Sequence, residues 1–76
     1  MTYQELENEV NNALKNKQKC LRKGQFIFNY LYKKYPVAVE AVQFEDRVDC
    51  FYVDEYIEKF LEYCVKRINE FYYEIS

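Results

Sequence analysis

Residues 54–76 read DEYIEKFLEYCVKRINEFYYEIS, and this segment sets the fold class of a 76-residue chain. Its apolar residues recur at alternating intervals of four and three, at Ile57, Leu61, Cys64, Ile68, Phe71 and Ile75. This spacing is typical of an amphipathic helix with a heptad seam. Asp54 is a good N-cap for such a helix, and early acids suit its first turn. We therefore predict a long helix over about 55–74.

The N-terminal segment carries a second, matching seam. Thr2 and Glu5 have the spacing of a capping box, in which each side chain bonds the other residue's backbone amide. Behind the box, seam positions follow at intervals of three and four: Tyr3, Leu6, Val10, Ala13, Lys17 and Cys20. The pattern predicts a helix over about 3–19, and Gly24 is expected to be a left-handed cap that ends or bends it.

The middle of the chain contains a shorter aromatic segment. Residues 25–34 have strand-like propensity, but a lone strand could not satisfy its backbone groups, so we predict a helix there. Pro36 suits the first turn of a further short helical segment over 37–42. Residues 43–53 are irregular, and we expect an ordered loop whose aromatic side chains fold back onto the core.

These patterns predict an all-α fold: one domain over 1–76, with three or four helices and a long amphipathic helix at the C-terminal end. We expect the two seams to pack on each other within one chain. The alternative is a homodimer through the 55–75 helix, because its apolar stripe is wide for so short a chain.

Composition disfavours several kinds of chemistry. The chain has no His and a single Gly, so it lacks the usual general base and zinc ligand and cannot build a glycine-rich phosphate loop. We predict no enzymatic activity, no cofactor and no metal site. The three cysteines, Cys20, Cys50 and Cys64, are expected to be reduced thiols in a cytoplasmic protein. We expect no signal peptide and no contact with a membrane.

Charge is divided unevenly along the chain. Residues 1–38 hold seven Lys and Arg against three Glu, whereas residues 39–76 hold four against ten acids. This asymmetry favours attraction between the two halves within the fold. The alternative is that the Lys15–Lys34 block binds nucleic acid. The phosphates would contact the basic side chains of Lys15, Lys19, Arg22, Lys23, Lys33 and Lys34, and the bases would stack on the aromatic residues between them. A pI near 5.1 makes nucleic acid the less favoured partner.

Two motifs in the middle of the chain carry a resemblance. They read Arg22-x-Gly24-Gln25-x-x-Phe28-Asn29-x-Leu31 and Asp49-x-Phe51-Tyr52-x-Asp54. This arrangement resembles a group of short uncharacterised proteins of bacteria, their phages and mobile elements, whose second motif has Pro where this chain has Cys50. The resemblance implies a small, soluble, mostly helical protein and no particular activity.

The same motifs give two expectations for individual residues. In a structural role, Gln25, Asn29, Asp49 and Asp54 would hydrogen-bond the loop around residues 51–52 to the 25–34 helix. In a functional role, the residues that would form a surface for a protein partner are Gln25, Asn29, Tyr32, Phe51 and Tyr52.

Protein binding is the function that the sequence favours. Nine tyrosines exceed what a thin core can hide, and tyrosine is a favoured interface anchor. We predict a phage- or mobile-element-type protein that binds a host protein in the host cytoplasm, with inhibition of a host enzyme or defence complex as the concrete form. The alternatives are a nucleic-acid accessory protein and an assembly subunit that dimerises through its last helix.

Overall fold

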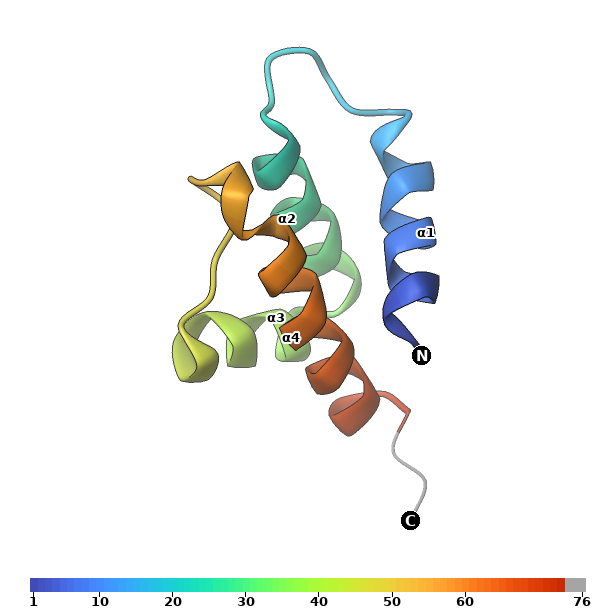
Figure 1. The fold of residues 1–76 in the computed structure, drawn as a ribbon, viewed down its shortest axis with the longest axis vertical. Coiled ribbons are helices and arrows are strands. Elements are labelled where there is room, and N and C mark those ends of the chain that lie inside the picture. The colour runs from blue at the N-terminus through green and yellow to red at the C-terminus, as the bar shows by residue number, and fades with distance from the viewer. Residues whose placement is uncertain (74–76) are drawn as a thin grey trace.

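The amphipathic patterns of the sequence become four α-helices in the computed structural model, which describes residues 1–73 (Figure 1). The helices are α1 (Tyr3–Leu14), α2 (Lys23–Lys34), α3 (Pro36–Ala41) and α4 (Ile57–Phe71). Between α3 and α4 lie a π-helical turn, η1 (Val42–Asp46), and a 3-10 turn, η2 (Asp54–Tyr56). No strand occurs in the described part of the chain, so the predicted all-α fold is confirmed.

The two predicted seams pack on each other inside one chain. In α4 the seam residues Leu61, Cys64 and Ile68 are buried, and in α1 Leu6 and Val10 are buried in the same cluster. Helix α1 contacts both α2 and α4. Helix α3 follows the C-terminal end of α2 and packs on both α2 and α4 (Figure 1). The middle of the α4 seam, from Leu61 to Ile68, is therefore covered within the monomer, whereas Phe71 at its end is exposed.

Helix α1 begins as predicted and ends earlier than predicted. The capping box is present: the amide of Glu5 donates to Thr2 Oγ1 at 3.1 Å, and the amide of Thr2 donates to Glu5 Oε1 at 2.8 Å. The helix ends at Leu14 instead of 19, and residues 15–22 form a linker to α2. The extension was wrong because the next seam position is Lys17, which cannot anchor a further turn in the core. Its Nζ donates instead to the carbonyls of Gln18 and Leu21.

Residues 25–34 are helical as predicted, although α2 starts two residues earlier, at Lys23. The role expected for Gly24 was wrong. Gly24 lies inside α2, and it does not have a positive φ. It is buried, and its importance comes from the loop that packs on it, described below. Pro36 is the first residue of α3, where its fixed φ suits a helix start.

The loop predicted over 43–53 is helical in its first part. Helix α3 continues into η1, and Arg47, with φ 57°, ends the turn in the left-handed region. The turn is held by Asp46, whose carboxylate accepts two hydrogen bonds from the Arg67 guanidinium, at 2.9 and 3.0 Å. Residues 47–53 are irregular, as expected. Phe51 folds back onto the core, but Phe44 is 69% exposed, so that part of the prediction was wrong.

Helix α4 is the longest element, as predicted, but its start and cap differ. Asp54 does not cap it, because η2 intervenes and α4 begins at Ile57. Helix α4 ends at Phe71, so the prediction was wrong for residues 72 and 73, and the predicted helix end at 74 and the seam position Ile75 lie outside the described residues. Within residues 1–73, none of the helices has the length and apolar character that a membrane span requires.

Candidate functional site: the aromatic surface beside α2

The loop before α4 docks on the first turn of α2. The guanidinium of Arg22 donates to the backbone carbonyls of Phe51 and Tyr52. The amide of Gly24 donates to Asp54 Oδ1 at 2.9 Å, and the thiol of Cys50 donates to the Gly24 carbonyl at 3.3 Å. Asp54 therefore satisfies a free amide at the start of α2, a helix 30 residues away in sequence. We call this set of contacts the loop–helix junction.

Gly24 is required at the junction because the loop backbone comes so close. A Cβ atom at this position would lie 2.2 Å from the carbonyl oxygen of Cys50 and 2.6 Å from Asp54 Oδ1. Both distances are far inside van der Waals contact. Cys50 itself is fully buried, so its carbonyl cannot easily move away.

The structural role predicted for four polar residues, a hydrogen bond between the loop and the helix, holds for Asp54 alone, because the bonds of Asp49 among the described residues stay within the loop and η1. Asp49 accepts from the amide of Phe51 at 2.7 Å and from Gln43 Nε2 at 3.3 Å, which shapes the loop. Asp54 bonds the loop to α2, as described. In residues 1–73 the hydrogen bonds of the junction do not use the side chains of Gln25 or Asn29, so the prediction was wrong for these two.

A row of aromatic rings runs from α2 onto the docked loop. The ring of Phe28, which is buried, lies 5.9 Å from Tyr32, 5.5 Å from Phe51 and 5.7 Å from Phe60, measured between centroids. Phe51 in turn contacts Tyr52 at 4.8 Å in an edge-to-face arrangement. Edge-to-face and tilted pairs at such distances are favourable geometries for aromatic rings. The row therefore leads from the core to two exposed tyrosines.

The five residues predicted to bind a protein partner lie on this side of the molecule. Gln25, Asn29 and Tyr32 follow each other at helical spacing on the outer face of α2, and Phe51 and Tyr52 are joined to that face through Phe28. Tyr52 is 76% exposed and Tyr32 is 39% exposed. Gln25 and Phe51 are half-buried, and Asn29 is exposed. We call these five residues the aromatic surface.

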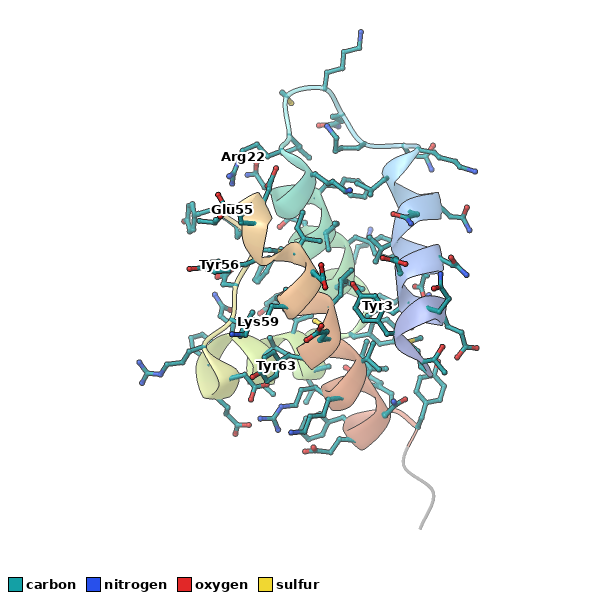
Figure 2. The ribbon with its side chains drawn as sticks, in the orientation of Figure 1. Tyr3, Arg22, Glu55, Tyr56, Lys59 and Tyr63 are labelled. Atoms are coloured by element: carbon teal, nitrogen blue, oxygen red, sulfur yellow. The ribbon has the colours of Figure 1, made fainter. Side chains whose placement is uncertain are left out.

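Arg22 links the aromatic surface to the rest of the fold. Figure 2 shows its side chain extending from the start of α2 toward the turn that carries Glu55. Its two backbone acceptors belong to consecutive residues, and the planar guanidinium donates to them from two separate nitrogens, whereas a lysine would have to reach both from a single ammonium. Arg22 therefore helps to set the orientation of Phe51 and Tyr52, together with the bond from the Phe51 amide to Asp49.

The six basic residues of the block have different environments in the structure, since two of them are bound to other residues and four are exposed. Arg22 is engaged in the junction, and Lys34 pairs with Glu9 and lies 5.5 Å from the ring centre of Tyr35. The remaining four candidates are exposed: Lys15, Lys19, Lys23 and Lys33. The aromatics expected between them are also divided, because Phe28 is in the core.

Glu9 organises a small polar network between α1 and α2. Its carboxylate accepts from the Tyr30 hydroxyl at 2.9 Å and from Lys34. The hydrogen bond from Lys34 raises the pKa of that ammonium, and burial together with Glu9 raises the pKa of Tyr30. Burial raises the pKa of the adjacent Tyr35 to about 12. All three groups therefore keep their protons at neutral pH, and Glu9 joins α1 to α2 through its bonds to Tyr30 and Lys34.

Contrary to expectation, the ion pairs among the described residues do not join the basic half of the chain to the acidic half. Lys34 pairs with Glu9 inside the first half, and Arg67 pairs with Glu45, Asp46 and Glu70 inside the second half. Among the described residues, each ion pair thus lies within one half. The excess charge of both halves remains on the surface, where a partner can meet it.

Two of the three cysteines are buried, and the third is exposed. Burial raises the pKa of the Cys50 thiol to about 12 and also raises that of Cys64, so both stay protonated and unreactive. Cys20 is an exposed free thiol in the linker. Within residues 1–73 no group of three or more His, Cys, Asp or Glu side chains is placed to hold a metal ion.

No protein-family model, curated protein sequence or solved structure matches this chain. Phe26 and Tyr30 were not among the predicted site residues, yet they stack on each other at 6.3 Å between ring centres on the flank that faces α1. Their spacing of four residues, which places both rings on one side of the helix, is the signal that indicates this pair.

Proposed function

We propose that this protein acts by binding another protein through the aromatic surface. The observation that carries the proposal is the exposure of Tyr32 and Tyr52 on a rigid support. Their rings continue a row that starts in the core at Phe28, and Arg22 holds the backbone beneath Phe51 and Tyr52. Large rings that are ordered before binding lose little entropy on association, which is the property of interface hot spots.

The partner is a host protein in this proposal. A small chain of phage or mobile-element type, as the two sequence motifs suggest, acts most directly by occupying a surface of a host enzyme or defence complex. The polar side chains of Gln25 and Asn29 border the exposed rings and are not used by the junction, so they are available for hydrogen bonds at the rim of an interface.

The test is a quantitative pull-down from nuclease-treated host lysate, followed by measurement of affinity with the purified partner. Tyr52→Ala with Tyr32→Ala is expected to weaken binding about 30-fold or more, as truncation of hot-spot tyrosines does. Phe44→Ala is the matched control, because Phe44 is an equally exposed aromatic residue on η1, away from α2. Because Tyr52 and Phe44 are largely exposed, their truncation should leave thermal stability almost unchanged.

Two results would refute the proposal. Equal loss of binding in Phe44→Ala would mean that exposed aromatic residues contribute generally and not through this surface. Unchanged binding in the Tyr52 and Tyr32 variant would place the interface elsewhere.

The alternative of a dimer through α4 meets a physical obstacle. Leu61 and Ile68 are buried in the monomer, so a dimer built on the same seam would require α4 to leave the core. Sedimentation equilibrium tests this directly: the proposal expects a monomer of 9.4 kDa over the micromolar range.

A further inference from the structure

A shallow hollow lies on the other flank of α2, between this helix and the linker from α1. Its volume is about 310 Å³, and its walls are mostly apolar. Phe26 and Tyr30 form one wall with their stacked rings, 12° from parallel. The linker supplies Leu21, and the outer face of α2 supplies Lys33 at the edge. The linker crosses from α1 to α2 at the end of the molecule opposite α3 (Figure 1).

Three carboxamides complete the lining: Asn16, Gln18 and Asn29. A carboxamide presents a donor and an acceptor side by side, which is the arrangement that pairs with the edge of a nucleobase. Aromatic side chains supply the flat surface on which a base stacks. The volume of the hollow lies at the lower end of the range of about 300–1,000 Å³ that is typical of small-molecule sites.

Lys33 lines the hollow, and the segment of chain that forms it is rich in lysine and contains no acidic residue. Between Glu9 and Glu40 the sequence contains no acidic residue. Four exposed lysines lie on the linker and on α2, and none of them belongs to an ion pair in residues 1–73: Lys15, Lys19, Lys23 and Lys33. The carboxylate of Glu9 lines an adjoining hollow that shares Asn16, Phe26 and Tyr30 with this one. This carboxylate accepts hydrogen bonds from Tyr30 and Lys34, and the Lys34 ammonium offsets its charge.

We propose that this hollow binds a single-stranded nucleic acid, with one base on the Phe26–Tyr30 pair and the flanking phosphates on the exposed lysines. The site differs from the basic block considered in the sequence, because it excludes Arg22 and Lys34 and pairs Tyr30, one of the interleaved aromatics, with Phe26, which the block did not include. It also goes beyond the proposed function, since it lies on the opposite flank of α2 from Tyr52. A polyanion suits this flank by charge, and the carboxamides favour bases over acidic side chains.

The experiment is fluorescence anisotropy with a fluorescein-labelled ten-nucleotide oligo-dT at 50 mM salt. We expect saturable binding. The logarithm of the association constant should fall with the logarithm of the salt concentration with a slope of about −2 to −3, because about four phosphates of a single strand are contacted. Lys19→Glu with Lys33→Glu should weaken binding about tenfold or more and make the slope shallower by about 1.4. Lys59→Glu with Lys66→Glu is the control, because it changes the net charge equally on α4.

Stacking is tested separately from charge. Phe26→Leu removes the ring but keeps an apolar side chain, and it should weaken oligonucleotide binding about tenfold. Phe44→Leu is its control. If Phe26→Leu lowers the melting temperature and so confuses the result, Asn29→Glu places an acid at the edge of the hollow from an exposed helical position, and it should weaken binding to a similar extent.

Three outcomes would overturn the proposal. The first is no change in anisotropy with up to 1 mM wild-type protein, and the second is an equal loss of oligonucleotide affinity in the α4 control. The third is full competition by a ten-residue polyglutamate, which would assign the hollow to acidic protein segments. Tyr52→Ala should leave oligonucleotide binding unchanged. Failure of the aromatic surface as a protein-binding site would therefore not affect this test, and failure of this test would not affect the other.

Discussion

Substitution of Gly24 by Ala tests the central packing argument of this fold. The position has ordinary helical geometry, so the added methyl group meets no backbone strain in α2 itself. It meets the loop instead, at 2.2 Å from the Cys50 carbonyl and 2.6 Å from Asp54 Oδ1. Relief of these contacts requires the loop to move by about 1 Å, since a methyl carbon and an oxygen need more than 3 Å.

The size of the effect follows from opposing contributions. Ala gains about 1 kcal/mol over Gly as a helix former. Against this, the partly exposed hydrogen bond between Gly24 and Asp54 is lost, at about 1 kcal/mol. Forcing a methyl group against backbone that is anchored by the buried Cys50 costs up to about 3 kcal/mol. The net expectation is a loss of up to about 3 kcal/mol in the free energy of unfolding.

The free energy of unfolding and the melting temperature are measured by urea and thermal denaturation, with far-ultraviolet circular dichroism as the probe. For a domain of this size, a loss of 3 kcal/mol lowers the melting temperature by more than about 10 °C. Asn29→Ala is the matched control, since it makes a helix-favouring change at an exposed position of the same helix. It should stabilise the protein by up to about 0.5 kcal/mol. If Gly24→Ala also stabilised the protein, the close approach of the loop would be refuted.

Three further predictions concern single side chains. Iodoacetamide at pH 8 should modify Cys20 alone in the native protein, because burial raises the pKa of Cys50 to about 12; mass spectrometry would count the modified thiols. Asp46→Asn should destabilise the fold by about 1–2 kcal/mol at pH 7, since it weakens the bonds to Arg67. Arg67 lowers the pKa of Asp46 below its ordinary value of 3.8, so the stability that this pair contributes is present above that pH and is lost as the pH falls through the native pKa. Urea denaturation should therefore show that the difference in unfolding free energy between wild type and Asp46→Asn vanishes in strong acid. Arg22→Lys should lower stability by about 1 kcal/mol and speed chymotryptic cleavage at residues 51–52, although the charge is kept.

The parts of the fold that depend on local pattern could be predicted from the sequence. The heptad spacing of residues 57–71 identified α4, and Thr2 with Glu5 identified the start of α1, because both signals act within one or two helical turns. The end of α1 could not be found in this way. A seam position at Lys17 is compatible with a helix in isolation, and only the absence of a core to cover it ends the helix at Leu14.

The parts that depend on contacts distant in sequence were missed. Local rules assigned Gly24 to a left-handed cap and Asp54 to the cap of its own helix, yet the two residues bond each other across 30 positions. Arg47 takes a left-handed conformation that no local signal indicates for an arginine. The two motifs did indicate which segments meet, because Arg22, Gly24 and Asp54 belong to them and all three contact the partner segment. Motif spacing thus carried long-range information that propensity did not.

The two proposed surfaces share one helix, and this has a consequence for how they could be used together. Asn29 belongs to the aromatic surface and also lines the hollow, whereas Tyr52 and Phe26 each belong to one flank alone. A helix is only about 10 Å wide, so a protein on one flank and a nucleic-acid strand on the other would meet at Asn29. Binding on the two flanks is therefore coupled through the space above this residue, although the rings that anchor each ligand are separate. A protein partner that covers Asn29 would exclude the strand, and one that contacts only Tyr32 and Tyr52 would leave the hollow open.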